Sequence, residues 1–465
     1  MTSWSCYKKW FDTLLSSQLP AHQSPPNIDD WCLDSRKISP GSWFIPIVGE
    51  KHDGHQFIKE TLEKGAGGFL YQKEKAHHLS DGEKASGIAV ADTLNAYQKL
   101  ASGWRTSLKG LKMFAITGSV GKTTCKEMLQ SILNTAGPTL ATFGNYNNEI
   151  GVPKTLLSIK PFHQYAVIEM GARRPGDIKK LVNIAKPNIS CCLNARTAHL
   201  EIFKSEQAIL NTKLEIVLQS ESAEAAVVFH DDPRILEVMK AHGRDFISFG
   251  YSPDATVNIV KEKWINSSNQ MELLFKIENE EYHLTLPALH SAFPINAAAS
   301  IAMAHTIDIP IKQAIDALSS FTGVSGRFKT HHKKGLTFID DAYNANLDSM
   351  EAGLHSFAKL YPNKEKILIL GDMLELGAQS VDAHKKIGTI CASIVKPKLL
   401  ITIGSRAKQI AESAIADGLT RKNTQSFSDI REYLEAQINL ANKGEVVFIK
   451  GSNSVGLNRI FDLYN

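Results

Sequence analysis

The order of apolar and polar positions predicts buried strands that alternate with helices. The apolar run from Met113 to Ile116 predicts a buried strand, and a helical pattern from Lys122 to about Leu133 follows it after a glycine-containing turn. Further apolar runs predict strands at Ala166 to Glu169, Asn188 to Leu193, Ala225 to Phe229, Phe246 to Phe249, Leu336 to Ile339, Lys366 to Leu370, Leu399 to Ile403 and Glu445 to Ile449. Residues 255–287 alternate between apolar and polar, which predicts antiparallel strands, and a small-residue helix is expected from His290 to Ala304. This succession indicates the α/β class.

The same pattern divides the chain into three parts. A length of 465 residues is typical of roughly three domains. We predict a small N-terminal α/β domain over residues 1–110. A central α/β domain over 111–326 is expected to have a parallel sheet with added antiparallel strands, and a C-terminal Rossmann-like α/β domain is expected over 327–465. The last part follows a βαβα order but lacks the glycine fingerprint of dinucleotide-binding domains, so we predict no NAD site there.

Composition narrows the functional classes. Lys and Arg total 52 against 48 Asp and Glu, so a net charge of +4 does not suggest nucleic-acid or membrane binding. The six cysteines form no CxxC motif, which favours a reducing compartment. No apolar run approaches a membrane span, and residues 1–19 lack the apolar centre of a signal peptide. We therefore expect a cytoplasmic protein without membrane insertion or nucleic-acid partners.

A glycine-containing loop joins the first central strand to its helix. Strand, glycine loop and helix together form a phosphate cradle, because the backbone N–H groups and the helix N-terminus point at the anion. Lys122 would reach the β- and γ-phosphates of a nucleotide, and the Thr123 hydroxyl would bind Mg²⁺. Ile116 stands where the usual motif has its first glycine, so the loop is shortened; an ordinary glycine turn before a helix is the disfavoured alternative. The cradle residues are Gly118, Ser119, Val120, Gly121, Lys122, Thr123 and Thr124.

Other candidates follow predicted strands or lie in polar loops. Glu169 ends a strand, where α/β folds place metal ligands, although a capping or ion-paired glutamate is the alternative. His199 and Lys213 follow another strand, and each alone fits a structural hydrogen bond or a solvated lysine as well. An asparagine-rich loop and a polar N-terminal loop could bind a ligand or be solvated turns; they contain Asn145, Asn147, Asn148, Ser35 and Arg36. Polar clusters also end three C-terminal strands, at 340–346, 371–377 and 450–453.

These motifs, in this order, resemble the Mur ligases of peptidoglycan synthesis over nearly the whole chain. The loop from Thr117 to Thr124 is similar to the TGxxGKTT of that family, which accounts for the shortened spacing. The stretches 145–153 (NYNNEIGVP), 340–346 (DDAYNAN) and 370–377 (LGDMLELG) resemble the branch that adds D-alanyl-D-alanine to UDP-N-acetylmuramoyl-tripeptide. One departure is Leu347, where that branch usually has Pro; the position is at a predicted helix start, where Pro is only favoured.

The resemblance implies a role for each matching residue. Lys122 and Thr123 would hold the ATP phosphates and one of two Mg²⁺ ions, with Glu169 sharing that ion. His199 would bind a second metal, and Lys213 would be carbamylated, which turns a cation into a metal-binding carboxylate analogue. Asn296 would contact adenine, Arg327 the phosphates and Asp341 the ribose. Ser35 and Arg36 would bind the UDP group, and the cleft between the central and C-terminal domains would be lined by Tyr343, Asn344 and Asn346.

The expected reaction joins a carboxylate to an amine through an acyl phosphate. Closure of the C-terminal domain over the central one would exclude water from that intermediate. Two alternatives remain: the related branch that adds the third amino acid of the peptide, or a P-loop ATPase switch that performs no ligation. A folylpolyglutamate synthase is a more distant relative that would not need the DSR segment at 34–36. Nothing in the sequence requires more than a monomer.

Overall fold

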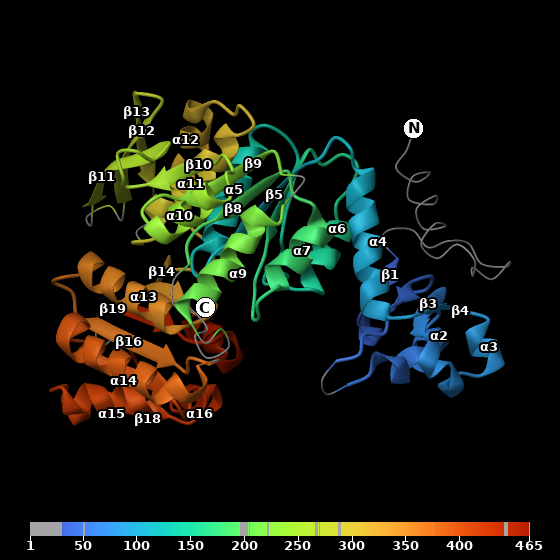
Figure 1. Ribbon diagram of the computed structural model, residues 1–465. Helices are drawn as coiled ribbons and strands as arrows, with labels where there is room; N and C mark the ends of the chain where they lie inside the picture. The colour runs from blue at the N-terminus through green and yellow to red at the C-terminus, as the bar shows by residue number, and fades with distance from the viewer. Residues whose placement is uncertain are drawn as a thin grey trace.

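Three sheets follow one another along the chain in this computed structural model (Figure 1). The N-terminal sheet (blue) and the C-terminal sheet (orange to red) lie on opposite sides of the view, and the central part joins them. The structure describes residues 30–49, 52–195, 203, 205–220, 223–265, 268, 270–286, 290–374, 376–440 and 445–464. The predicted α/β class is therefore confirmed. The boundaries at 110 and 326 stay predictions; they fall between sheets.

The N-terminal sheet has four parallel strands in the order β1-β2-β3-β4. They are β1 (Trp31–Cys32), β2 (Trp43–Phe44), β3 (Gly68–Gln72) and β4 (Gly87–Val90), with short helices α2 (Ile58–Glu63) and α3 (Asp81–Lys84) between them. Helix α4 (Thr93–Ser107) leads from this sheet to the central part, and its Trp104 Nε1 donates to the Ile159 carbonyl at 2.9 Å.

The central sheet has nine strands in the order β13-β12-β11-β10-β9-β8-β5-β7-β6. Strands β5 to β11 are parallel where they pair, and β11, β12 and β13 are antiparallel. The bounds are β5 (Lys112–Thr117), β6 (Thr139–Ala141), β7 (Tyr165–Glu169), β8 (Ile189–Cys192), β9 (Ala225–Phe229), β10 (Ile247–Gly250), β11 (Val257–Ile265), β12 (Gln270–Ile277) and β13 (Glu280–Leu286). The predicted parallel sheet with an antiparallel extension is confirmed; β6, short and only partly buried, was not predicted.

Helices cover the central sheet on both faces. They are α5 (Lys122–Asn134), α6 (Gly151–Leu157), α7 (Asp177–Ala185), α9 (Glu206–Leu218), α10 (Pro233–Ala241), α11 (Phe293–His305) and α12 (Ile311–Ser319). Helix α11 is almost wholly buried, which its small side chains permit, since they let the helix approach α5 closely; Ser300 Oγ donates to the Cys125 carbonyl at 3.2 Å. The phosphate loop therefore rests on a rigid pair of packed helices.

The C-terminal sheet has six strands in the order β14-β15-β19-β16-β17-β18, all parallel except β14. The strands are β14 (Lys329–Lys333), β15 (Leu336–Asp341), β16 (Lys366–Gly371), β17 (Leu399–Ile403), β18 (Thr424–Phe427) and β19 (Val446–Lys450), with helices α13 (Leu347–Leu360), α14 (Ser380–Ile390), α15 (Lys408–Ala416) and α16 (Ile430–Glu435). The sequence predicted the four inner strands. It missed β14 and β18, because edge strands with polar residues have no apolar run.

Candidate active site at the phosphate loop

The glycine loop lies between β5 and α5, as the sequence predicted. Gly121 has a φ of +87° and forms the cap of α5. A Cβ atom at this position would lie 2.5 Å from Asn296 Oδ1, so the site needs glycine for both reasons. Asn296 itself is buried on α11. The positive φ at Gly121 and the close approach of Asn296 on α11 therefore both require a residue without a side chain at position 121.

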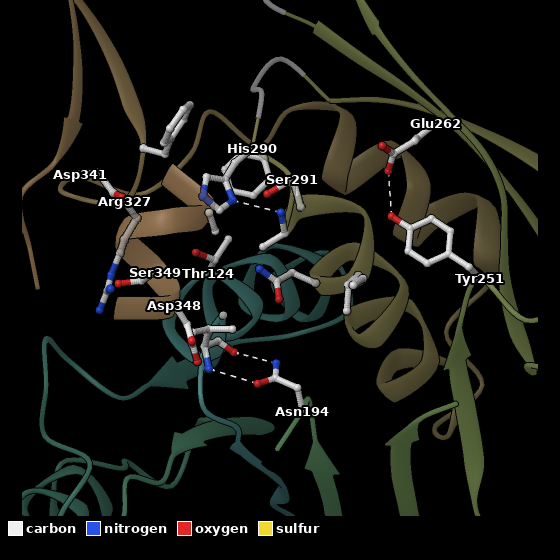
Figure 2. A pocket seen from close by; sticks show the side chains of 18 residues that line it. Thr124, Asn194, Tyr251, Glu262, His290, Ser291, Arg327, Asp341, Asp348 and Ser349 are labelled. Atoms are coloured by element: carbon white, nitrogen blue, oxygen red, sulfur yellow. Dashed lines mark hydrogen bonds between the residues drawn. The ribbon is translucent and has the colours of Figure 1, made fainter. Parts of the chain in front are cut away.

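Asn194, just after β8, holds the loop in shape. Its Oδ1 accepts hydrogen bonds from the backbone N–H groups of Ser119 (3.1 Å) and Val120 (3.2 Å). Its Nδ2 donates to the Val120 carbonyl at 3.0 Å. One carboxamide thus orders two consecutive loop peptides. Figure 2 shows this contact at the base of the pocket described below.

Lys122 folds back over the loop. Its ammonium donates to the Gly118 carbonyl at 2.8 Å and to the Ser119 carbonyl at 3.4 Å. Burial lowers the pKa of Lys122, while the Glu169 carboxylate opposes that shift and the Arg327 guanidinium adds to it. Two cations and one carboxylate therefore meet at the loop. An anionic ligand with several charges would balance this site.

The end of β7 brings a carboxylate to the first turn of α5. Thr123 Oγ1 donates to Glu169 Oε2 at 2.9 Å, and Asn147 Nδ2 donates to Glu169 Oε1 at 2.8 Å. Glu169 is buried, and its backbone N–H donates to Thr142 Oγ1 at 2.9 Å. These contacts hold both carboxylate oxygens beside the phosphate loop. The structure thus brings together three residues that the sequence singled out separately.

Oxygen donors at this point suit Mg²⁺, which prefers carboxylate and hydroxyl ligands. Thr123 and Glu169 provide one of each at hydrogen-bond distance from the other, so these residues fit such an ion. No group of three or more His, Cys, Asp or Glu side chains that could enclose a metal occurs within the part of the chain that the structure describes. His199, predicted as a second metal ligand, lies outside the described residues.

Lys213 is buried on α9 near the same loop. Burial and the neighbouring Lys122 ammonium together lower the pKa of Lys213 to about 7, although Cys192, Glu215 and Asp177 act in the opposite direction. Glu215 instead accepts hydrogen bonds from the backbone N–H groups of Gly176 and Lys179, both at 2.8 Å. Lys213 is therefore a buried amine with a large neutral fraction near pH 7. It is not the solvated lysine that the sequence left open.

Arg327 reaches the loop from the start of the C-terminal part. Its Nη2 donates to Thr123 Oγ1 at 3.3 Å across 204 positions of sequence. Its Cζ lies 4.3 Å from the centre of the Tyr343 ring. Among the described residues, the buried Arg327 Nε has no hydrogen-bond partner. A buried N–H without a partner is a donor available to a ligand.

A pocket of about 400 Å³ opens beside the loop, between the central and C-terminal parts (Figure 2). The labelled side chains of Arg327, Asp341, Asp348 and Ser349 approach it from one side and His290 and Thr124 from another. The other lining residues are Val120, Gly121, Asn194, Tyr251, Glu262, Ser291, Ala292, Phe293, Ile295, Asn296, Phe328 and Ala352. The lining of the pocket combines apolar and polar side chains, as in sites for small organic ligands. The predicted adenine and ribose residues, Asn296 and Asp341, share this pocket.

Asp341 is held by a buried ion pair in that pocket. Lys450 Nζ lies 2.7 Å from Asp341 Oδ2 and also donates to the Asn344 carbonyl at 3.1 Å. His290 lies nearby; burial lowers its pKa to about 4, although the Asp341 carboxylate opposes the shift. His290 is therefore neutral at physiological pH. Lys450 belongs to the strand-end cluster at 450–453, but its pairing with Asp341 was not predicted.

Two of the remaining predicted residues accept hydrogen bonds at helix starts, and a third is exposed. Asn148 Oδ1 accepts from the Gly151 N–H at 2.8 Å at the start of α6, and Asn346 Oδ1 caps α13 by accepting from the Ser349 N–H at 2.9 Å. Helix α13 does begin at Leu347, where the Mur branch usually has Pro. Asn145 is exposed.

The N-terminal candidates lie in a separate part of the molecule. The Arg36 guanidinium is exposed and pairs with Asp34 at 2.8 Å, and the Ser35 carbonyl accepts from Lys64 Nζ at 3.1 Å. Both residues belong to the N-terminal part, across the view from the C-terminal sheet (Figure 1). The structure therefore does not bring Ser35 and Arg36 into the pocket of Figure 2.

Sequence reasoning assigned no individual role to three residues of the site, although Lys450 lies in the predicted polar cluster at 450–453. Asn194 and Lys450 are polar residues at the ends of parallel strands, the position that such folds use for ligands. That signal was present, but it does not distinguish a residue that contacts the ligand from one that supports the loop. His290 begins the segment leading into α11 and had no distinguishing spacing.

Family models match three stretches of the chain. The Mur ligase middle domain matches residues 116–304, the Mur ligase glutamate ligase domain matches 326–453, and the model described as Mur ligase family, catalytic domain, matches 28–105.

Among the helices that the structure describes, none combines the length and the apolar character that a membrane span needs.

Relatives and solved structures agree with these models. A UDP-N-acetylmuramoyl-tripeptide–D-alanyl-D-alanine ligase of Synechocystis is 32% identical over 435 residues, which cover 93% of this chain and 91% of the relative. A crystal structure of MurF from Acinetobacter baumannii is 29% identical with a TM-score of 0.86, covering 98% of both chains. The MurF ligase of Thermotoga maritima in complex with ADP is 27% identical with a TM-score of 0.77, covering 93% of this chain and 96% of that one. With this geometry and these relatives, the chain belongs to the Mur ligase family.

Proposed function

We propose that this chain is an ATP-dependent ligase that joins the free carboxylate of UDP-N-acetylmuramoyl-tripeptide to the amine of D-alanyl-D-alanine. The observation that carries this proposal is the meeting of Lys122, Glu169 and Arg327 at the phosphate loop, where Glu169 and Arg327 both contact the Thr123 hydroxyl and Lys122 contacts the loop carbonyls. A cation from a separate sheet-bearing part reaches the loop, where it would neutralise charge on a phosphoryl group during transfer. The relatives at 30–34% identity carry the D-alanyl-D-alanine ligase name, which favours this branch over the one that adds the third amino acid.

The first step makes the carboxylate reactive. A carboxylate oxygen attacks the γ-phosphorus of ATP, the bond to the bridging oxygen breaks, and ADP leaves. The loop N–H groups and the Lys122 ammonium would hold the β- and γ-phosphates, while Arg327 would neutralise charge on the transferred group. Its unpartnered Nε and its Nη2, now on Thr123, are both donors suited to phosphate oxygens.

The second step forms the amide. The amine nitrogen attacks the carbonyl carbon of the acyl phosphate, the tetrahedral intermediate collapses with loss of inorganic phosphate, and the amine gives up a proton. An acyl phosphate exposed to bulk water would hydrolyse, so the site must exclude water. The packing of the C-terminal part over the pocket, with Ser356 Oγ donating to Ser291 Oγ at 3.0 Å, provides such a cover. The amine substrate would enter from the C-terminal side, along Asn344.

ATP and Mg²⁺ are the proposed cofactors. The ADP complex of the Thermotoga relative supports nucleotide binding by this chain. When bound at Thr123 and Glu169, Mg²⁺ would offset phosphate charge. The proposed carbamate of Lys213 draws support from its burial and its pKa of about 7, because CO₂ adds only to the neutral amine. Asn296 and Asp341 are proposed to contact adenine and ribose, and Ser35 with Arg36 the uridine diphosphate. We also propose that the protein is a cytoplasmic monomer. Its localisation in the cell and light scattering of the purified protein test these two points.

The experiment that tests the proposed function measures phosphate release from Mg·ATP. UDP-N-acetylmuramoyl-tripeptide and D-alanyl-D-alanine are added separately and together, and mass spectrometry follows the products. Release that requires both substrates, with formation of the UDP-linked pentapeptide, is the expected result. Release that neither substrate changes would support an ATPase switch. Product formation from a UDP-linked dipeptide and a free amino acid would move the chain to the neighbouring branch.

A further inference from the structure

The segment that enters the C-terminal part makes a tight turn just before β14. Val324 and Arg327 form an antiparallel bridge, and the Arg327 N–H donates to the Val324 carbonyl at 3.0 Å. Gly326 has a φ of +72°, which favours glycine. A Cβ atom on Gly326 would lie 2.9 Å from Tyr343 Cβ. The turn is therefore pressed against the end of β15, and its shape fixes the direction in which Arg327 leaves the backbone.

Asp340 fastens this turn to the C-terminal sheet. Its Oδ2 accepts from the Gly326 N–H at 2.9 Å, and its Oδ1 accepts from the Ala342 N–H at 3.2 Å. The Tyr343 N–H donates in return to the Gly326 carbonyl at 3.1 Å. Asp340 is buried, and the His331 imidazole also lies near it, with Nε2 3.7 Å from Asp340 Oδ2. A single carboxylate thus joins the turn before Arg327 to the segment that contains Tyr343.

Tyr343 provides the surface on which the guanidinium lies. The Arg327 Cζ is 4.3 Å from the ring centre, a distance at which a cation is attracted to the aromatic face. The Arg327 Nη2 meanwhile donates to Thr123 Oγ1 at 3.3 Å, in the first turn of α5. The Tyr343 ring and the Thr123 hydroxyl therefore constrain the guanidinium from two sides.

We infer that Asp340 and Tyr343 are positioning residues for Arg327. Asp340 sets the turn, Tyr343 sets the plane of the guanidinium, and together they place an arginine of the C-terminal part at the phosphate loop of the central part. This inference rests on the proposed function, because it assigns a consequence for phosphoryl transfer. It also reassigns Tyr343, which the sequence predicted to be a substrate contact, to a role exerted through Arg327.

A positioning role differs from a purely structural one in how mutational effects combine. If Tyr343 acts through Arg327, its replacement has little effect once Arg327 is gone, because residues that act as a unit are not additive. If Tyr343 binds substrate or only stabilises the fold, its effect remains in the Arg327→Ala background. The same reasoning applies to Asp340.

The test is a pair of double-mutant cycles on the full chain. Arg327→Ala is combined with Tyr343→Leu in one cycle and with Asp340→Asn in the other, and kcat and KM are measured for each substrate. Tyr343→Phe tests whether the ring alone suffices. Asp382→Asn, which removes an exposed carboxylate from α14, is the matched control for Asp340→Asn. Thermal unfolding of every variant identifies those that fail to fold.

We expect Tyr343→Leu and Asp340→Asn each to lower kcat about tenfold. Tyr343→Leu removes the cation–aromatic contact of Arg327, and Asp340→Asn removes the charge from the acceptor that holds the Gly326 N–H in the turn before Arg327. Neither should change kcat further in the Arg327→Ala background. Asp382→Asn should keep kcat within about twofold of the parent. Tyr343→Phe, which keeps the ring, should lower kcat less than Tyr343→Leu does. Full additivity in a cycle, or a loss in Tyr343→Phe equal to that in Tyr343→Leu, would overturn the inference for that residue.

The same variants are titrated with Mg·ATP by calorimetry, which separates two kinds of failure. Absence of amide product from the unaltered chain would refute the proposed function. In that case the cycles are analysed in the dissociation constant for Mg·ATP, and additivity there as well would refute the inference. Product formation with additive cycles would leave the function intact and reject the positioning roles alone.

Discussion

Thr123 Oγ1 donates a hydrogen bond of 2.9 Å to Glu169 Oε2, which ties the first turn of α5 to the end of β7. The two residues belong to neighbouring strand-and-helix units of one parallel sheet, and their side chains meet at its carboxyl edge. This edge is where open α/β sheets place their ligands. The contact therefore defines the point at which a nucleotide-bound cation would lie.

Glu169→Gln tests that point directly. The amide keeps one oxygen and the size of the side chain but loses the charge that a divalent cation needs. We expect phosphate release and ligation to fall by about 100-fold or more, a loss typical of removing an electrostatic contact from a transition state. Activity measured across a Mg²⁺ titration should show a higher requirement for the ion. Glu237→Gln, an exposed residue of α10, is the control and should behave as the parent; equal loss in both variants would contradict the assignment.

Replacing Asn194 should weaken nucleotide binding through the shape of the loop. Asn194→Ala removes two acceptor contacts and one donor contact from Ser119 and Val120. Freed from this support, the loop must be ordered by the nucleotide itself, and we expect KM for ATP to rise about tenfold. Asn194→Asp keeps the acceptors but cannot donate when ionised, so its KM should improve as the pH falls. A flat pH profile for KM in that variant would argue against the proposed contact geometry.

Lys213→Met should separate stability from activity. The pKa of Lys213 is lowered from 10.5 to about 7, so between these values the unfolded chain binds more protons than the folded one. The free energy of unfolding therefore rises with pH across this window, and burial of the amine is destabilising below it. We expect Lys213→Met to be inactive, to unfold at a higher temperature at pH 7, and to show a smaller rise in stability from pH 7 to 9. Urea unfolding in CO₂-free buffer measures this; an unchanged slope would contradict it.

Carbamylation of Lys213 should depend on pH in the same window. Only the neutral amine adds CO₂, and its fraction grows as the pH rises through about 7. With ¹³C-labelled bicarbonate, we expect a carbamate resonance in the parent chain that strengthens from pH 6 to 8 and is absent from Lys213→Met. Persistence of that resonance in the variant would assign it to another lysine.

His290 should make stability fall at mildly acidic pH. Its pKa is lowered from 6.5 to about 4, so the folded state resists a proton that the unfolded chain accepts. The free energy of unfolding is therefore unaffected above pH 6.5 by this residue and decreases as the pH falls from 6.5 through about 4. His290→Gln should show a shallower decrease in Tm over that range. An identical pH dependence in both chains would mean that other groups dominate.

Replacing one partner of the buried ion pair between Lys450 and Asp341 should strongly lower the free energy of unfolding. Both side chains are nearly inaccessible, and their charged atoms lie 2.7 Å apart. Lys450→Met leaves Asp341 charged and unpaired, and we expect a loss of about 3–5 kcal/mol in the free energy of unfolding. Because Asp341 also lines the pocket, KM for ATP should rise in the folded fraction. Lys408→Met, an exposed lysine at the start of α15, is the control and should change stability by less than about 0.5 kcal/mol.

The sequence determined those features that contiguous residues fix among themselves. The apolar run of β5, the glycine turn and the pattern of α5 are local, so the strand, the glycine loop and the helix around Gly118 to Thr124 were predicted correctly. The four inner C-terminal strands could be predicted for the same reason, because buried parallel strands are continuous apolar runs. The two edge strands were missed because their polar residues face solvent.

Only the tertiary structure decided how distant side chains meet. Arg327 and Thr123 are 204 positions apart, and no period in the sequence encodes that the turn at Gly326 directs one toward the other. Likewise, the sequence could mark Asn346 as polar at a strand end but could not show that it caps α13. Strand order and the packing of one sheet-bearing part on another bring such residues together. The hydrophobic free energy that favours these arrangements comes from the burial of whole surfaces. It does not come from the short motifs that carry the chemistry.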